Sequence, residues 1–233
     1  STGKQPVLRL ELPPFHVRAI YVPFGLLTRP DIIENLLTLV QTTELNAMVI
    51  DMKGDRGWLG FPAQTPLALE LGVNRRDVMD IRELLKRCHE AGIYTVARQV
   101  VFKDHPLATT RPEWAAVTAD GSIWLDREGL GWGNPFLQEV QDYNVAIAVE
   151  IASLGFDEIQ FDYLRFPSDG EVSQIVYTQE NTPETRSAAV AGTGSRGGGG
   201  GSAGRASEVK SSARAMPWPL MDALSGMKTR SVG

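Results

Sequence analysis

Cysteine is almost missing from this chain of 233 residues, which contains one, Cys88. A single thiol can form neither an internal disulfide nor a cysteine metal cluster. Histidine is also rare, with three residues, so a histidine-rich metal site is not expected. Cys88 falls in the helical pattern IRELLKRCHEAG, and we interpret it as a structural thiol. The sequence therefore predicts no metal centre and no cofactor.

Two further absences concern partners. Lys and Arg number 23 against 28 Asp and Glu, and phosphate-backbone partners normally select a basic surface, so we expect no nucleic acid partner. No run of roughly 18 apolar residues occurs, so no membrane span is predicted. Residues 1–14 lack the basic-then-apolar layout of a signal peptide. Either the protein is cytoplasmic or its targeting segment lies outside this sequence, so the location stays open.

The chain does contain a regular alternation of two kinds of segment between residues 17 and 167. Short apolar runs rich in β-branched residues alternate with helical patterns that begin at capping residues. This order predicts a parallel sheet covered by helices. The predicted strands are 17–23, 46–53, 92–102 and 156–166, and the predicted helices are 28–42, 74–92, 134–154 and one that begins at 182.

A doubly wound sheet and a (β/α)8 barrel both fit this alternation. The loops after the second and third predicted strands are long, at about 52–74 and 102–134, whereas the returns into the next strands are tight, as in a barrel. No glycine-rich phosphate loop follows a strand, which argues against a dinucleotide-binding sheet. The sequence therefore predicts an α/β fold, a partial (β/α)8 TIM barrel of about four β/α units.

The last part of the chain differs in composition. From residue 192 onward Gly, Ser, Ala and Arg dominate, without an apolar period. We interpret residues 1–16 as an N-terminal extension, 17–191 as the N-terminal half of a TIM barrel, and 192–233 as a low-complexity tail that is disordered or read out of frame. A half barrel leaves its first and fourth strands unpaired at the edges, so self-association through these edges is expected.

Side-chain alternation along the strands directs certain carboxylates into the barrel. In the fourth strand Ile159 and Phe161 face the helices, whereas Glu158 and Asp162 face the lumen. Asp51 faces the lumen from the second strand. A carboxylate is costly there unless it does chemistry or pairs with a cation, and glycoside hydrolysis requires two carboxyl groups across the reacting bond. The predicted catalytic residues are Asp162, our first choice, with Asp51 and Glu158.

Aromatic and polar residues close to the strand ends are candidate substrate ligands. Tryptophan rings in long loops can stack on sugar rings, although long loops also use Trp simply to pack. Lys53 beside Asp51 equally fits a pair that only orients its loop. For Asp162 with Arg165 we favour a functional role over the alternative of a buried pair that only holds the strand end. The predicted substrate-binding residues are Tyr21, Lys53, Trp58, Arg98, Asp104, His105, Trp124, Trp132, Tyr163 and Arg165.

The stretch from residue 17 to 170 resembles a bacterial "putative glycosyl hydrolase" domain family. The resemblance implies a barrel distantly similar to α-amylase-like glycosidases, and a polysaccharide-directed hydrolase outside the cell or at its surface. It also implies that members continue after Val190 with the second half of the barrel and a second carboxylate, so this chain alone is expected to be inactive. The matching motifs are TELNAMVIDMKGDRG (43–57), GIYTVARQVVFKDHPLA (92–108), RPEWAAVTADGSIWLD (111–126), GWGNPFLQEVQDYNVAIAVE (131–150) and LGFDEIQFDYLRFPSDG (154–170).

We therefore expect a fragment of a glycoside hydrolase that acts on a polysaccharide or oligosaccharide by carboxylate catalysis. Two alternatives stay open, because one fold hosts many chemistries. The first is a carbohydrate-binding barrel without turnover, in which the tryptophans line the rim. The second is a metal-dependent polysaccharide hydrolase or deacetylase that uses Asp51, Asp104 and His105.

Overall fold

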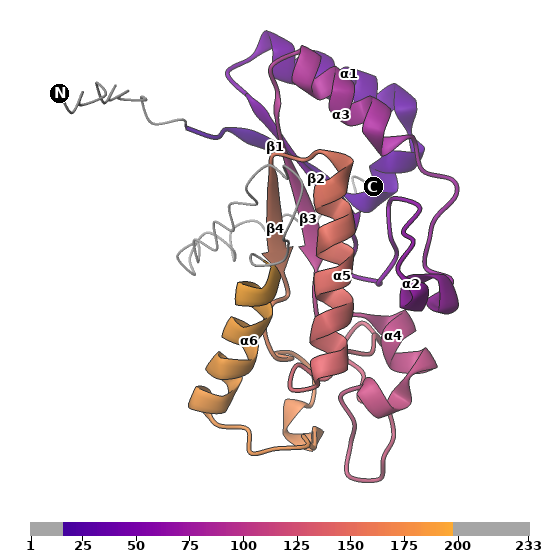
Figure 1. Cartoon of the computed structure of the whole chain (residues 1–233), viewed down its shortest axis with the longest axis vertical. Coiled ribbons are helices and arrows are strands. Elements are labelled where there is room, and N and C mark those ends of the chain that lie inside the picture. Colours follow the sequence, from indigo (N-terminus) through magenta and orange to yellow (C-terminus); the bar gives the residue numbers. More distant parts are fainter. Residues whose placement is uncertain (1–15, 198–233) are drawn as a thin grey trace, which may run out of the picture.

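The computed structural model describes residues 16–197, with side chains as far as Thr193. At its centre lies a parallel sheet with the strand order β1-β2-β3-β4 (Figure 1). The strands are β1 Ala19–Val22, β2 Ala47–Lys53, β3 Tyr94–Val100 and β4 Glu158–Asp162. The α-helices are α1 Pro30–Thr42, α2 Pro66–Leu71, α3 Ile81–Glu90, α4 His105–Thr110, α5 Gln138–Leu154 and α6 Pro183–Gly197, and short 3-10 helices are η1 Phe24–Thr28, η2 Pro112–Trp114 and η3 Val172–Gln174.

The strands follow one another across the sheet without a reversal of order. A doubly wound sheet would reverse its order at a switch point, and this sheet does not. Because β-α-β crossovers are right-handed, an unreversed order places successive helices on the same face. In Figure 1, α5 lies along β3 and β4, and α6 lies beside α5. The predicted α/β fold with the topology of a partial barrel is confirmed.

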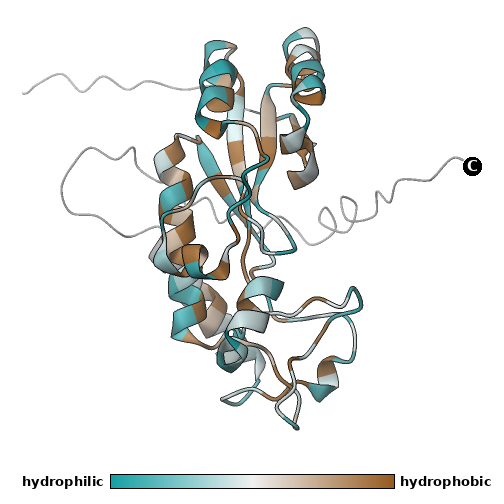
Figure 2. Ribbon diagram, turned by 90° about the vertical axis from the view of Figure 1, so that its right-hand side faces the viewer, coloured by the Kyte–Doolittle hydropathy of each residue, from teal (hydrophilic) through white to brown (hydrophobic). Residues whose placement is uncertain are grey.

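The face of the sheet that the helices cover is apolar. Met48, Ile50 and Met52 of β2 are fully buried and belong to one core cluster with Leu84 of α3 and Ile147 of α5. Each such side chain contributes about 1.5–3 kcal/mol when it leaves water. Along the helices in Figure 2, brown and teal segments alternate, as expected when one side of a helix packs against a sheet. The opposite face of the sheet therefore carries the residues that the alternation directs into the lumen.

Two helices, α3 and α5, begin several residues later than predicted. The helix expected from Asn74 begins at Ile81, after Asp80, whose carboxylate accepts hydrogen bonds from two backbone N–H groups of the first turn at 2.9 and 3.3 Å. The helix expected from Asn134 begins at Gln138. The Asn134 side chain instead closes a turn that precedes the helix, by accepting a hydrogen bond from a backbone N–H at 3.1 Å. Asn74 instead donates a hydrogen bond to the Ala63 carbonyl at 2.8 Å, so neither asparagine caps the helix that follows it.

The long loops and the C-terminal end also depart from the prediction. Short helices α2, α4 and η2 occupy parts of the two long loops, although no apolar period predicted them. Helix α6 continues to Gly197, beyond the expected boundary at residue 191. The remainder of the predicted tail, and residues 1–15 of the predicted N-terminal extension, lie outside the described residues.

Candidate functional site

Strand β4 ends at Asp162 because the next residue leaves the extended conformation. Tyr163 has φ of 51°, in the left-handed region that residues with a Cβ atom rarely adopt, and its N–H donates a hydrogen bond to Asp162 Oδ1 at 2.7 Å. This conformation costs about 1–2 kcal/mol, and such strain is concentrated at functional sites. The strained turn leaves the Asp162 side chain at the carboxyl end of the strand, where barrel enzymes place their chemistry.

Arg98 joins the carboxylates of the two neighbouring strands. Its Nη1 donates to Asp51 Oδ1 at 2.7 Å, and its Nε and Nη2 donate to Asp162 Oδ2 at 2.8 and 2.5 Å. Asp51 and Arg98 are register partners on β2 and β3, and Asp162 lies opposite Val100 on β4. The structure therefore brings together the carboxylates of Asp51 and Asp162, which the side-chain alternation directs to one edge of the sheet.

The two carboxylates accept three hydrogen bonds each but differ in how exposed they are. The Asp51 side chain is 5% exposed, and its Oδ2 also accepts hydrogen bonds from the Tyr21 hydroxyl at 2.6 Å and the Phe24 N–H at 3.2 Å. The Asp162 side chain is 26% exposed. The Asp51 carboxylate is thus enclosed by the protein, whereas the Asp162 carboxylate is accessible to solvent.

Arg98 is a permanent cation in this cluster. Burial disfavours its charged form, but Asp51 and then Asp162 outweigh that effect and raise the pKa of Arg98 above its ordinary value. The guanidinium also lies 5.6 Å from the centre of the Tyr21 ring. Burial, and then the negative charge of Asp51, raise the pKa of the Tyr21 hydroxyl well above its usual range. Tyr21 therefore stays a neutral donor to Asp51.

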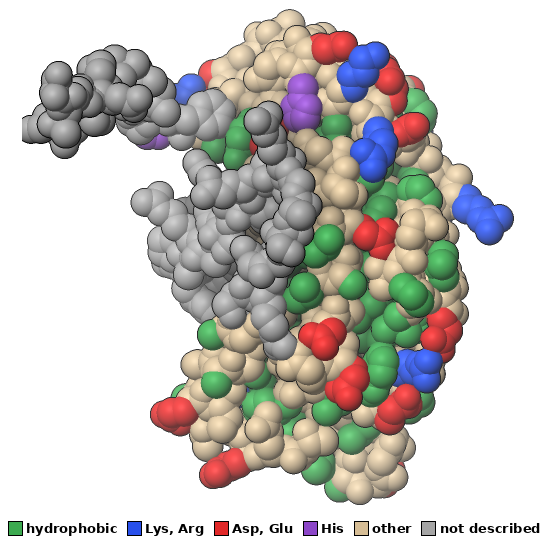
Figure 3. Space-filling model, in the orientation of Figure 1, with side chains coloured by type: hydrophobic (Ala, Val, Ile, Leu, Met, Phe, Trp, Pro, Cys, Tyr) green, Lys and Arg blue, Asp and Glu red, His purple; other side chains and the backbone are tan. Residues whose placement is uncertain are grey.

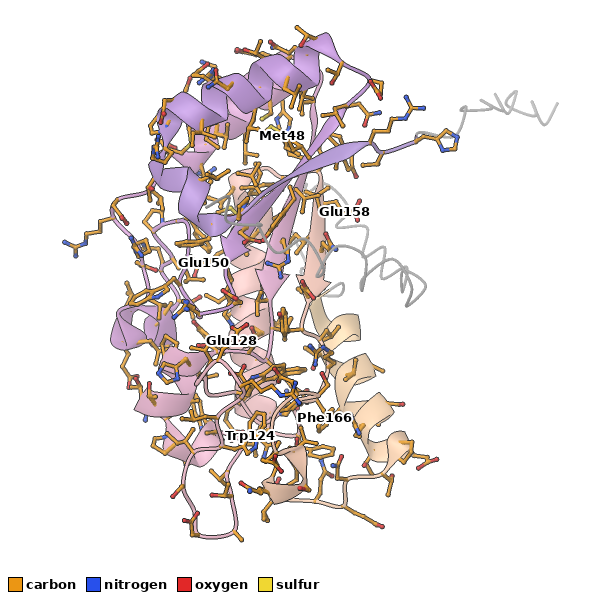
Figure 4. The ribbon with its side chains drawn as sticks, turned by 180° about the vertical axis from the view of Figure 1, so that it is seen from behind. Met48, Trp124, Glu128, Glu150, Glu158 and Phe166 are labelled. Carbon is orange, nitrogen blue, oxygen red and sulfur yellow. The ribbon has the colours of Figure 1, made fainter. Side chains whose placement is uncertain are left out.

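Glu158, the third predicted catalytic carboxylate, is not part of this cluster. It is the first residue of β4 and pairs in register with Val96, whereas Asp162 is the last residue of the strand. Figure 4 shows Glu158 towards the end of β4 that is remote from Glu128, Trp124 and Phe166. The alternation correctly gave the face of Glu158, but the position along the strand separates it from Asp162.

Lys53 and Asp104 form a fully buried ion pair, with Lys53 Nζ 2.7 Å from Asp104 Oδ2 and both side chains 0% exposed. Lys53 Nζ also donates to Asn144 Oδ1 of α5 at 2.8 Å. The register between β2 and β3 shifts after Asp51, and this irregularity lets Lys53 reach the helix-covered side of the sheet. Both side chains are enclosed by protein, and the ion pair joins the end of β2 to the start of α4.

His105 lies at the start of α4, and its Nδ1 accepts a hydrogen bond from the Gly131 N–H at 3.0 Å. With Asp104 paired to Lys53 and Asp51 held by Arg98, the side chains named for a metal-dependent mechanism do not converge. Across residues 16–197, no group of three or more His, Cys, Asp and Glu side chains has the arrangement of a metal site.

The predicted tryptophan ligands are mostly packed into the protein. Trp124 is 2% exposed and its indole N–H donates to the Glu171 carbonyl at 3.0 Å. Trp132 is 1% exposed and donates to Asp126 Oδ2 at 3.0 Å. Trp58 is partly buried, with the Arg75 guanidinium 5.9 Å from its ring centre. Trp124 and Trp132 therefore stabilise the loops and are not free stacking surfaces for a sugar.

A second polar cluster lies at the same edge, and sequence reasoning missed most of it. Lys103 Nζ is 3.0 Å from Asp126 Oδ2 and 2.9 Å from Glu128 Oε2. Burial lowers the pKa of Lys103, but hydrogen bonds to Glu128 and Asp126 have the larger, opposite effect. The net pKa of Lys103 is therefore above its ordinary value. Asp126 and Glu128 lie in a loop without periodicity, so the only signal in the sequence was the position of Lys103 just after a strand.

Two predicted binding residues, Tyr163 and Arg165, border this second cluster. Lys103 Nζ lies 5.5 Å from the centre of the Tyr163 ring, and the ring of Trp132 meets the same ring edge-on at 5.6 Å. The Arg165 guanidinium lies 5.0 Å from the Tyr163 ring centre and 5.4 Å from that of Trp132. Tyr163 thus links the Lys103 cluster to Asp162, its neighbour in the chain.

An open groove of about 390 Å³ lies elsewhere on the loops, and no residue predicted for the site lines it. The groove is lined by Pro112, Glu113, Ala115, Val117, Gly121, Asn134, Val176, Tyr177 and Thr178.

On the face shown in Figure 3, Lys and Arg side chains lie apart from one another among acidic ones and form no continuous basic patch. Among the helices of the described part of the chain, none combines the length and the apolar character needed to cross a membrane.

A solved structure of a bacterial protein is similar to this chain at appreciable sequence identity. A hypothetical protein from Ruminiclostridium thermocellum ATCC 27405 is 30% identical with a TM-score of 0.68, and the match covers 75% of this chain and 90% of that one. Among curated proteins no match is found.

Two glycosidases are similar at lower identity. TtGalA, an α-galactosidase from Thermus thermophilus solved with p-nitrophenyl α-D-galactopyranoside, is 19% identical with a TM-score of 0.52, covering 81% of this chain and 36% of its own. The α-L-fucosidase isoenzyme 2 from Paenibacillus thiaminolyticus is 16% identical with a TM-score of 0.53, covering 78% and 29%. This chain spans about a third of each of these glycosidases, and the likeness shows a shared fold, that of TIM-barrel glycosidases.

A family model described as "Putative glycosyl hydrolase domain" matches residues 19–193. The match includes all four strands and the cluster of Asp51, Arg98 and Asp162. Because it extends over most of the chain, this protein belongs to the putative glycosyl hydrolase domain family.

Proposed function

We propose that this chain is part of a glycoside hydrolase that acts on a polysaccharide or oligosaccharide, with Asp162 as the carboxylate that meets the reacting sugar. The observation that carries the proposal is the accessible Asp162 carboxylate, which Arg98 holds at the carboxyl end of β4. Asp51 holds Arg98 in turn, at 2.7 Å. The family membership and the shared fold support the same reaction class.

The contacts favour Asp162 as the nucleophile of a retaining mechanism. A nucleophilic carboxylate must be anionic when its oxygen attacks the anomeric carbon and the glycosidic C–O bond breaks. A guanidinium that donates two hydrogen bonds to Asp162 suits an anion and does not suit a general acid. Asp51 and Tyr21 then act through Arg98, as positioning residues. The proton for the leaving group comes from a second carboxyl group, which we place outside the described half of the barrel.

Activated substrates test this assignment. The 2,4-dinitrophenolate group leaves without being protonated, so the reaction does not require the second carboxyl group that would otherwise donate a proton. We suggest the 2,4-dinitrophenyl α-D-galactoside and α-L-fucoside, chosen from the activities named for the two similar glycosidases. Slow release of dinitrophenolate is expected, and Asp162→Asn is expected to reduce it at least about 100-fold. A glycosyl adduct on the Asp162 peptide, detected by mass spectrometry, would identify the nucleophile directly.

Glu158→Gln is the matched control, because Glu158 lies on the same strand and the same face as Asp162 but at the other end. Its rate is expected to equal that of the unmodified chain. Equal loss of activity in both variants would refute the assignment of Asp162.

A carbohydrate-binding barrel without turnover is the second candidate. The half-exposed ring of Tyr21, on the lumen side of the sheet, favours it as a surface for a sugar ring. Glycan binding without any release of dinitrophenolate, unaffected by Asp162→Asn, would favour this candidate over the hydrolase.

A further inference from the structure

Glu128 is an exposed carboxylate at the edge of the sheet where Asp162 lies. It belongs to the loop that connects β3 and α5, and Figure 4 shows it away from Glu158, on the side of the carboxyl ends of the strands. Its side chain is 57% exposed. An exposed glutamate by itself is ordinary, so the significance of Glu128 depends on how it is held.

A buried lysine fixes the Glu128 carboxylate. Lys103 Nζ, on a side chain 4% exposed, lies 2.9 Å from Glu128 Oε2, and Asp126 Oδ1 accepts the Glu128 N–H at 2.9 Å. By contrast, the exposed pair of Arg87 and Glu34 has side chains 35% and 56% exposed. Two exposed partners restrain each other little, whereas a lysine enclosed by protein has already lost its freedom. Glu128 is therefore a solvent-facing anion in a fixed position.

The fixed anion is connected to Asp162 through Tyr163. Lys103 Nζ lies 5.5 Å from the centre of the Tyr163 ring, and the Tyr163 N–H donates to Asp162 Oδ1 at 2.7 Å. Sugar sites combine carboxylates, which accept hydroxyl hydrogen bonds, with neighbouring aromatic residues, and Tyr163 both contacts the lysine that holds Glu128 and follows Asp162 in the chain. Each carboxylate would then contact a different part of one sugar.

We propose that Glu128, anchored by Lys103, accepts a hydrogen bond from a hydroxyl group of the sugar that is bound against Asp162, and so determines which sugar the site takes. The inference rests on the proposed glycosidase function. It assigns Glu128 to substrate recognition and gives it no part in bond breaking.

A binding experiment with Asp162→Asn as the background tests this role without turnover. The probes are methyl α-D-galactopyranoside, methyl α-L-fucopyranoside and the monodeoxy derivatives of whichever binds, with dissociation constants measured by titration NMR. Glu128→Gln is expected to weaken binding about 10- to 100-fold, as the loss of a charged hydrogen-bond acceptor does. One monodeoxy sugar is expected to bind to the protein with Glu128 intact as weakly as the complete sugar binds to the Glu128→Gln variant. The Glu128→Gln substitution is expected to cause no further loss of affinity for that monodeoxy sugar.

Glu34→Gln is the matched control, because it removes the charge of an equally exposed, ion-paired glutamate on α1. Unchanged affinity in Glu128→Gln, in a chain that binds or cleaves glycosides, would overturn the inference and leave the proposed function intact. A chain that neither binds the probes nor releases dinitrophenolate would overturn both.

Discussion

Arg98 is the side chain on which the arrangement of the candidate site depends, because two carboxylates share it. We expect Arg98→Met to lower the free energy of unfolding by about 3 kcal/mol, since it leaves the nearly buried carboxylate of Asp51 without its cation. Urea unfolding followed by tryptophan fluorescence measures the change. The double variant Arg98→Met with Asp51→Asn should recover a large part of it, and an unchanged urea midpoint in Arg98→Met would contradict the prediction.

The acid stability of the protein should depend on Asp126. Burial raises the pKa of Asp126, but hydrogen bonds from the Leu130 N–H, the Trp132 indole and Lys103 lower it to a net value below the ordinary one. A lowered pKa in the folded state contributes stability above the unfolded-state pKa of about 3.9, and the contribution is lost as the pH falls through the folded-state value.

Asp126→Asn removes that contribution. The difference in unfolding free energy between the unmodified chain and this variant is therefore expected to be larger at pH 7 than at pH 3, as measured by urea unfolding at both values. A difference that stays constant with pH would rule out the role of Asp126. Protection of Cys88 from alkylation at neutral pH reports that each variant is folded, because burial raises the pKa of this thiol to about 11.

Residues within strands could be placed from the sequence, and residues in loops could not. The two-residue period gave the inward direction of Asp51 and Asp162, and the strand ends gave their shared edge. Lys53 does not follow this two-residue alternation, because the register between β2 and β3 shifts between Asp51 and Lys53. Glu128 and the burial of Trp132 depend on contacts between distant parts of the chain, which no local pattern contains.

At the scale of elements, the loop after β2 is fitted closely against the start of α4. Gly57 has φ of 80°, and a Cβ atom there would lie 2.5 Å from Asp104 Oδ1 and 2.8 Å from Pro106 Cδ. Both the backbone conformation and the contact therefore require glycine. The loop thus covers the buried pair of Lys53 and Asp104, which joins β2 to α4.

Gly57→Ala is accordingly expected to lower the free energy of unfolding by about 3 kcal/mol, of which strain in the left-handed region accounts for about 1–2 kcal/mol. Gly121→Ala is the matched control, since Gly121 has φ of 82° but no atom within 4 Å of the added Cβ. The same urea unfolding measurement compares them. Equal losses in the two variants would show that the contact with Asp104 contributes nothing.

At the scale of the whole molecule, the described sheet is open at both sides. Strands β1 and β4 each pair with one neighbour within residues 16–197, and a closed barrel would give each a second. We expect the purified chain to associate as its concentration rises. Sedimentation velocity over a hundredfold range of concentration measures this, and a single monomeric species throughout would show that the edges are protected.

Sharing one guanidinium between two acidic residues also limits how this protein can diverge. A substitution at Arg98 leaves two neighbouring negative charges without compensation, and a substitution at either aspartate leaves the guanidinium half satisfied. Positions 51, 98 and 162 are therefore expected to be inherited as a unit, so that lineages that lose the arginine also neutralise an aspartate. A relative in which all three positions are replaced together is expected to lack the proposed carboxylate catalysis.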